Sequence, residues 1–170
     1  MCTGNICRSP LAEQMLRLRL GGDPRFEIGS AGLHAVVGSP MDEEAAAQLR
    51  LHGGDPSTPR GEQLGEGHAA AADLILTMTR GQRDEVVRRH PETIKRVFTL
   101  AELRQLIEQV EPVGDPRSRL ARAAEIRGAV RLRSEDDVPD PIDAPTAVHA
   151  AVAAQIVELT DAIAEGLARP

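Results

Sequence analysis

The residues Cys2-Thr3-Gly4-Asn5-Ile6-Cys7-Arg8-Ser9-Pro10, followed by LAEQMLRLRL at 11–20, carry the clearest structural signal in the sequence. Gly4 and Asn5 tolerate the backbone conformations of a tight loop, and Ser9-Pro10 is typical of a helix N-terminus. The stretch 10–20 places apolar residues at helical spacing. We therefore expect a tight loop that leads directly into a helix over 10–20.

The same loop has the features of an anion-binding site. Its successive backbone amides would point inward, with the positive end of the helix dipole behind them. Arg8 adds a planar guanidinium that can hold two oxygens of one phosphate group. The positive surroundings favour the thiolate form of Cys2, which is a nucleophile. These residues predict a phosphate site that contains a nucleophilic cysteine.

Beyond the loop, short apolar segments alternate with amphipathic ones. The expected strands are 26–30, 74–78 and 96–100, and the expected helices are 42–52, 81–90, 102–110 and 145–167. The strand at 74–78 is apolar throughout, as in a strand buried on both faces of a parallel sheet. This alternation predicts an α/β fold in which helices flank a parallel sheet.

The length of 170 residues, 41% of them hydrophobic, suits one domain over 1–170 better than two. Segment 111–137 is rich in Arg and acidic residues, so we expect an inserted or mobile region with a short helix at 120–130. The sequence has neither eighteen consecutive apolar residues nor a signal-peptide pattern. We expect a cytoplasmic protein that does not bind membranes.

Composition argues against several other classes of function. A net charge of −6 and an aromatic content of 1%, with no Trp or Tyr, argue against a surface that binds nucleic acid. The histidines show no metal-ligand spacing, so we predict no metal site and no cofactor. They are His34, His52, His68, His90 and His149.

Residues 2–10 resemble the signature of the low-molecular-weight protein tyrosine phosphatase family. Four further segments fall in that family's order and approximate spacing: Ser30-Ala31-Gly32, 72–79, 97–100 and Pro139-Asp140-Pro141. The resemblance implies a four-stranded parallel sheet flanked by helices. It also implies a central strand directly before the catalytic cysteine. Since the sequence given begins at Met1, we expect that strand to be missing here and the true start to lie upstream.

The resemblance also implies roles for individual residues. Cys2 would attack phosphorus to form a phosphocysteine, Arg8 would stabilise the equatorial oxygens, and Asp140 would act as the general acid. Asp137 and Asp143 are alternatives for the acid. The residues implied to bind phosphate or support the loop are Thr3, Gly4, Asn5, Ile6, Cys7, Ser9 and Ser30. The implied partner is a phosphorylated protein or a small phosphomonoester.

The substrate is less well defined than the chemistry. Tyrosine phosphatases of this family line their pocket with aromatic side chains, whereas 33–36 and 142–143 contain none here. Ile6 favours phosphotyrosine over phosphoarginine, because members acting on phosphoarginine tend to have a threonine there. We expect a protein tyrosine phosphatase. An arsenate reductase-like thiol enzyme and a catalytically silent phosphate-binding module remain alternatives.

Cys7 has two open interpretations. It is a candidate resolving thiol that forms a reversible disulfide with Cys2 under oxidation, or it is a packed and inert side chain.

Overall fold

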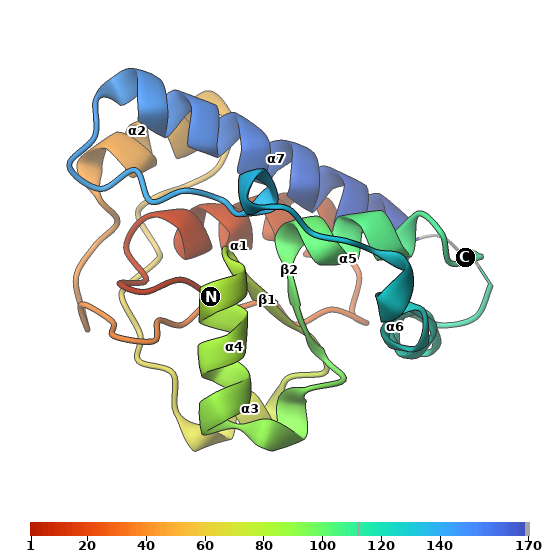
Figure 1. Ribbon diagram of the computed structural model, residues 1–170. Coiled ribbons are helices and arrows are strands. Elements are labelled where there is room, and N and C mark those ends of the chain that lie inside the picture. The colour runs from red at the N-terminus through yellow and green to blue at the C-terminus, as the bar shows by residue number, and fades with distance from the viewer. Residues whose placement is uncertain (112, 169–170) are drawn as a thin grey trace.

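A small parallel sheet lies between two groups of helices in the computed structural model, which describes residues 1–111 and 113–168 (Figure 1). The sheet pairs β1 (Ile75–Thr77) with β2 (Val97–Thr99). Below it in Figure 1 lie α3 (Glu66–Ala71) and α4 (Arg80–Arg89). Above it lie α1 (Arg8–Leu20), α2 (Glu43–Leu51), α5 (Leu100–Ile107) and α7 (Thr146–Ala168). The predicted α/β class is confirmed.

The sheet has fewer regular strands than the four expected. Residues 26–30 form no strand, and the described part of the chain adds only the single parallel bridges Cys2–Gly32 and Gly32–Gln63 to β1 and β2. The backbone nitrogen of Met1 donates to the Leu76 carbonyl at 2.7 Å, and that of Leu33 donates to the Cys2 carbonyl at 3.0 Å. Residues 1 and 2 therefore lie between β1 and the segment at Gly32, where two residues can form a bridge but not a longer ladder.

Capping side chains determine where several helices begin. The Asp42 carboxylate accepts a hydrogen bond from the Ala45 backbone nitrogen at 3.0 Å, so α2 begins directly after it. Thr99 and Glu102 form a reciprocal capping box, with bonds of 3.0 and 3.3 Å. This box starts α5 at Leu100, two residues earlier than predicted, and ends β2 at Thr99.

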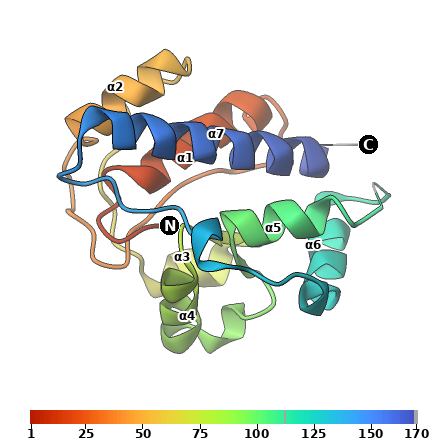
Figure 2. The same cartoon turned by 45° about the horizontal axis from the view of Figure 1, so that its top comes forward.

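The longest described helix, α7, lies along α1 on one face of the molecule in both views (Figures 1 and 2). By length and composition it could cross a membrane, even though no eighteen consecutive residues are apolar. Val152, Ile156 and Ile163 are at most 4% exposed and belong to the main hydrophobic core. Packing against α1 and α5 thus accounts for the apolar composition of α7.

Segment 111–137 contains a helix earlier than predicted. The helix α6 (Pro116–Glu125) begins where the Asp115 carboxylate caps the Ser118 nitrogen at 2.9 Å, so the expected bounds of 120–130 are wrong.

Two short 3₁₀ helices follow α6, η2 (Arg127–Ala129) and η3 (Ser134–Asp136), and another, η1 (Pro91–Thr93), precedes β2. Within α6, Arg119 and Ala123 are fully buried, and Arg119 donates to the Gly166 carbonyl of α7 at 2.9 Å. Residue 112 lies outside the described residues.

Candidate active site

Two polar groups contact the sulfur of Cys2, which is buried at the start of the predicted loop. The hydroxyl oxygen of Ser9 lies 2.9 Å from Sγ, and the backbone nitrogen of Asn5 donates to Sγ at 3.3 Å. Ser9 Oγ also accepts a hydrogen bond from Asn5 Nδ2 at 2.8 Å, which leaves the hydroxyl hydrogen free to be donated to Cys2. Both contacts therefore place a hydrogen-bonding group against the sulfur of the candidate nucleophile.

Asn5 holds the loop from within. Its backbone has a positive φ of 56°, the left-handed conformation that asparagine tolerates better than most residues. Its Nδ2 donates to Ser9 Oγ and to Ser30 Oγ, both at 2.8 Å, and its Oδ1 accepts from the Glu62 backbone nitrogen at 2.8 Å. Ser30 in turn donates to the Glu13 carboxylate at 2.7 Å. The predicted support residues Asn5, Ser9 and Ser30 therefore form one network, and Glu13 is a member that the sequence did not reveal.

Gly32 allows the loop to pack against its neighbouring segment. A Cβ atom at this position would lie 2.5 Å from the Thr3 carbonyl oxygen and 3.0 Å from Asn5 Cβ. The first distance is shorter than any ordinary contact to a backbone atom, so only glycine fits without a shift of the loop. The resemblance included Gly32 among its matching segments, but the close approach of this residue to the loop depends on tertiary packing.

The remaining loop residues are held by their outward-facing polar groups. The Gly4 carbonyl accepts from the Val36 nitrogen at 2.9 Å, and the Ile6 carbonyl accepts from the Asp42 nitrogen at 2.7 Å. The Thr3 hydroxyl accepts from Gln82 Nε2 at 3.2 Å. Gln82 is a second supporting residue that the sequence did not reveal.

Arg8 and Asp140 meet at the mouth of the loop. The Arg8 side chain is 4% exposed, and it donates to the Val138 carbonyl at 3.1 Å and forms an ion pair with the Asp140 carboxylate. The Val138 backbone nitrogen donates to the Met78 carbonyl at 2.9 Å, which holds the segment carrying Asp140 at the carboxyl end of β1. Asp140 is half exposed, so its carboxylate contacts Arg8 and is also open to solvent.

The two alternative acids lie elsewhere. The Asp137 carboxylate accepts from the Arg80 backbone nitrogen at 2.9 Å at the start of α4. Asp143 is an exposed turn residue with a positive φ of 61°. Of the three candidates, only Asp140 contacts Arg8 among the described residues.

Cys7 occupies a buried position behind the loop, at the N-cap of α1. Burial raises the pKa of Cys7 to about 12, and the nearby Asp42 carboxylate adds to this effect. The side chain therefore remains a neutral thiol at neutral pH. Both Cys2 and Cys7 are free thiols in the structure.

The exposed surface around the loop is aliphatic. Val36, Val37 and Ile142 are 48%, 69% and 38% exposed. Phe98 is buried in the hydrophobic core, Phe26 is partly buried against it, and the sequence has no Trp or Tyr.

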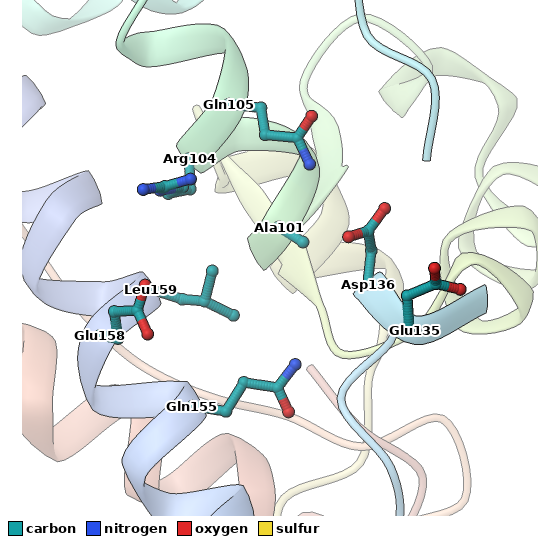
Figure 3. Close-up of a pocket in the computed structure, with 8 residues that line it drawn as sticks. All are labelled: Ala101, Arg104, Gln105, Glu135, Asp136, Gln155, Glu158 and Leu159. Carbon is teal, nitrogen blue, oxygen red and sulfur yellow. The ribbon is translucent and has the colours of Figure 1, made fainter. Parts of the chain in front are cut away.

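The pocket in Figure 3 is separate from the loop. It has a volume of about 170 Å³ and lies between α5, α7 and η3. Its lining is mostly polar and charged: Ala101, Arg104, Gln105, Glu135, Asp136, Gln155, Glu158 and Leu159. None of the predicted site residues lines it.

Comparison with known proteins places this loop in a known family. The model of the family described as low molecular weight phosphotyrosine protein phosphatase matches residues 1–124. A relative from Ralstonia nicotianae, described as the probable low molecular weight protein-tyrosine-phosphatase EpsP, is 42% identical over 105 residues, which cover 62% of this chain and 70% of the relative. A protein-arginine-phosphatase from Geobacillus stearothermophilus is 30% identical over 167 residues, which cover 98% of this chain and 93% of the relative.

Solved structures give the same result over most of the chain. The YwlE arginine phosphatase from Geobacillus stearothermophilus aligns with a TM-score of 0.72 at 30% identity and covers 96% of this chain and 87% of that one. The Erwinia amylovora tyrosine phosphatase amsI aligns with a TM-score of 0.75 at 25% identity and covers 99% and 90%. Loop, fold and full-length similarity agree, and the chain belongs to the low molecular weight phosphotyrosine protein phosphatase family.

Proposed function

We propose that the protein is a cysteine-dependent phosphatase that hydrolyses phosphate monoesters on proteins through a phosphocysteine on Cys2, with phosphotyrosine as the favoured substrate. The observation that carries this proposal is the convergence of Arg8 and Asp140 at the mouth of the loop that contains Cys2. It combines a nucleophile, an anion-binding group and a proton donor in one site.

In the first step, Sγ of Cys2 attacks phosphorus, an S–P bond forms and the bond from phosphorus to the leaving oxygen breaks. The protonated Asp140 gives its proton to that oxygen as it leaves. Arg8 and the loop amides bind the three oxygens that stay on phosphorus, where negative charge is spread in the transition state.

In the second step, Asp140 removes a proton from a water molecule that attacks phosphorus. The S–P bond breaks, inorganic phosphate forms, and the electron pair returns to Sγ of Cys2. Ser9, 2.9 Å from Sγ, donates a hydrogen bond that stabilises the departing thiolate.

The Arg8–Asp140 ion pair fits this sequence of steps. A phosphate group bound in the loop competes with Asp140 for the guanidinium of Arg8. Substrate binding would therefore release the Asp140 carboxyl group from Arg8, so that it could act on the leaving oxygen.

Substrate choice rests on weaker support than the chemistry. Relatives include proteins named as tyrosine phosphatases and as an arginine phosphatase. The side chain of Ile6 has no polar atom that could hydrogen-bond a guanidinium. The exposed side chains of Val36 and Ile142 can contact an aryl ring. Phosphoarginine is therefore the second candidate. The family match supports a phosphatase over an arsenate reductase or a silent phosphate-binding module.

The direct test measures hydrolysis of p-nitrophenyl phosphate by the wild type and by Cys2→Ser. We expect turnover by the wild type only. Equal rates would overturn the proposal, and arsenate-dependent thiol oxidation in place of hydrolysis would favour the reductase. A cytoplasmic location, which suits a chemistry that needs free thiols, is part of the proposal and is tested by fractionation of cells.

A further inference from the structure

Three potential metal ligands from distant parts of the sequence meet behind the phosphate loop. They are the thiol of Cys7 at the N-cap of α1, the carboxylate of Asp42 at the N-cap of α2, and the imidazole of His149 in the first turn of α7. Their ligand atoms all lie within 4.8 Å of one another. The three helices contact each other, so the packing of the fold fixes this arrangement.

His149 supplies a second and independent observation. Its side chain is 97% buried, since only 3% of it is exposed, and Nδ1 has no hydrogen-bond partner among the described residues. Asp42 Oδ1 lies 3.8 Å from Nδ1, which is beyond hydrogen-bond distance. Buried polar atoms are normally paired, so an unpartnered Nδ1 that faces a carboxylate and a thiol indicates that something binds there.

We propose that Cys7, Asp42 and His149 bind one zinc-like divalent cation. Thiolate sulfur, imidazole nitrogen and carboxylate oxygen are the ligand types that Zn²⁺ prefers, at about 2.3, 2.0 and 2.0 Å. Ligand atoms around a tetrahedral ion with such bonds lie about 3.2–3.8 Å apart. Shifts of about 1 Å from the present positions would form the site.

The remaining groups are compatible with a bound cation. Asp42 Oδ1 caps the Ala45 nitrogen at 3.0 Å, and the carboxylate has a second oxygen for the metal. Since 30% of the Asp42 side chain is exposed, the fourth position is open to a water molecule. On binding, the Cys7 thiol releases its proton to solvent, and the charges of thiolate and carboxylate balance the two charges of the ion.

Such an ion would support the catalytic loop rather than take part in catalysis. Cys7 precedes Arg8, and the Asp42 backbone nitrogen donates to the Ile6 carbonyl at 2.7 Å. The metal would therefore connect the back of the loop to α2 and α7. It would also keep Cys7 from forming a disulfide with Cys2, because its sulfur would be a metal ligand.

The test uses Cys2→Ser protein, in which Cys7 is the sole thiol because the chain has two cysteines. The purified protein is treated with chelator and titrated with Co²⁺, whose visible spectrum reports tetrahedral geometry and whose thiolate bond gives a near-ultraviolet charge-transfer band. We expect one equivalent to bind with that band, and Zn²⁺ to displace it. The absence of the band would overturn the proposal.

Three further substitutions in the same background identify the ligands. We expect His149→Leu and Asp42→Asn to weaken Co²⁺ affinity by about 100-fold, whereas His52→Leu, at the end of α2 and outside the cluster, leaves it unchanged. Circular dichroism checks that each variant folds. If His149→Leu fails to fold, the Co²⁺ affinity of Asp42→Asn alone tests the assignment. That variant should fold, because asparagine also caps helices. Affinity that is unchanged in Asp42→Asn and in any folded His149 variant would contradict the assignment. These outcomes do not depend on phosphatase activity.

Discussion

The guanidinium of Arg8 forms an ion pair with the carboxylate of Asp140, although 132 positions of sequence separate the two residues. The loop from Val138 to Asp140 is held at the end of β1 by the hydrogen bond between Val138 and Met78. The fold therefore places the carboxyl group that we propose as general acid beside the guanidinium that we propose binds phosphate.

The first prediction concerns Asp140 as general acid. Asp140→Asn should lower kcat/KM for phenyl phosphate by at least about 100-fold, because kcat/KM reports the first step, in which a poor leaving group needs the proton. The loss should be smaller for p-nitrophenyl phosphate, whose leaving group is stable as an anion. Steady-state kinetics with a series of aryl phosphates measures this, with Asp143→Asn as the matched control. An equal loss across the series would assign Asp140 a positioning role instead.

The second prediction concerns the bracing of the loop by Asn5. Asn5→Ala removes three hydrogen bonds and places alanine at a φ of 56°. We expect the free energy of unfolding to fall by about 2–4 kcal/mol, measured by urea denaturation. Ser30→Ala, which removes one hydrogen bond to Asn5 and one to Glu13, should have a smaller effect. Equal effects of the two substitutions would mean that Asn5 is not the centre of the network.

The third prediction concerns the close approach at Gly32. Gly32→Ala places a methyl group 2.5 Å from the Thr3 carbonyl, so the loop must shift and kcat/KM should fall by about 10-fold or more. Gly29→Ala is the control, because a Cβ there meets nothing within 4 Å. The ratio of the two kcat/KM values checks the idea, and a fully active Gly32→Ala enzyme would refute it.

The fourth prediction concerns substrate choice at Ile6. Threonine is β-branched like isoleucine but offers a hydroxyl to a guanidinium. Ile6→Thr should raise kcat/KM for phosphoarginine relative to phosphotyrosine in matched peptides, whereas Ile6→Val should leave the ratio unchanged. If the wild type already prefers phosphoarginine, the proposed substrate is wrong.

The sequence predicted the loop well because the residues that define the loop are adjacent in the sequence. Nine adjacent residues specify a tight turn that leads into a helix, although α1 begins at Arg8, two residues earlier than predicted. The resemblance added Ser30 and Asp140 as candidate site residues. The support from Glu13 and Gln82 was not predictable, because it depends on how distant elements pack. The same reason hid the cluster at His149, whose partners lie more than a hundred positions away.

Of the three predicted strands, 74–78 and 96–100 were confirmed as β1 and β2, whereas 26–30 was wrong. Residues 26–30 have strand-like alternation, but a strand needs a neighbour, and pairing is a property of the fold rather than of the segment. The start of α5 at Leu100 could have been predicted from the sequence, because Thr99 and Glu102 have the spacing of a capping box. This capping box outweighed the apolar pattern that predicted a strand as far as residue 100.

The central claim is that Cys2 carries the phosphoryl group during turnover, and acid quenching of the working enzyme tests it most directly. Peptide mass spectrometry of Asp140→Ala protein, mixed with p-nitrophenyl phosphate and quenched within one turnover, locates the covalent phosphoryl group. The account predicts one phosphoryl group on the peptide that contains Cys2, and none in the Cys2→Ser, Asp140→Ala double variant. Hydrolysis that proceeds without a phosphoryl group on Cys2, or with one on another residue, would contradict it.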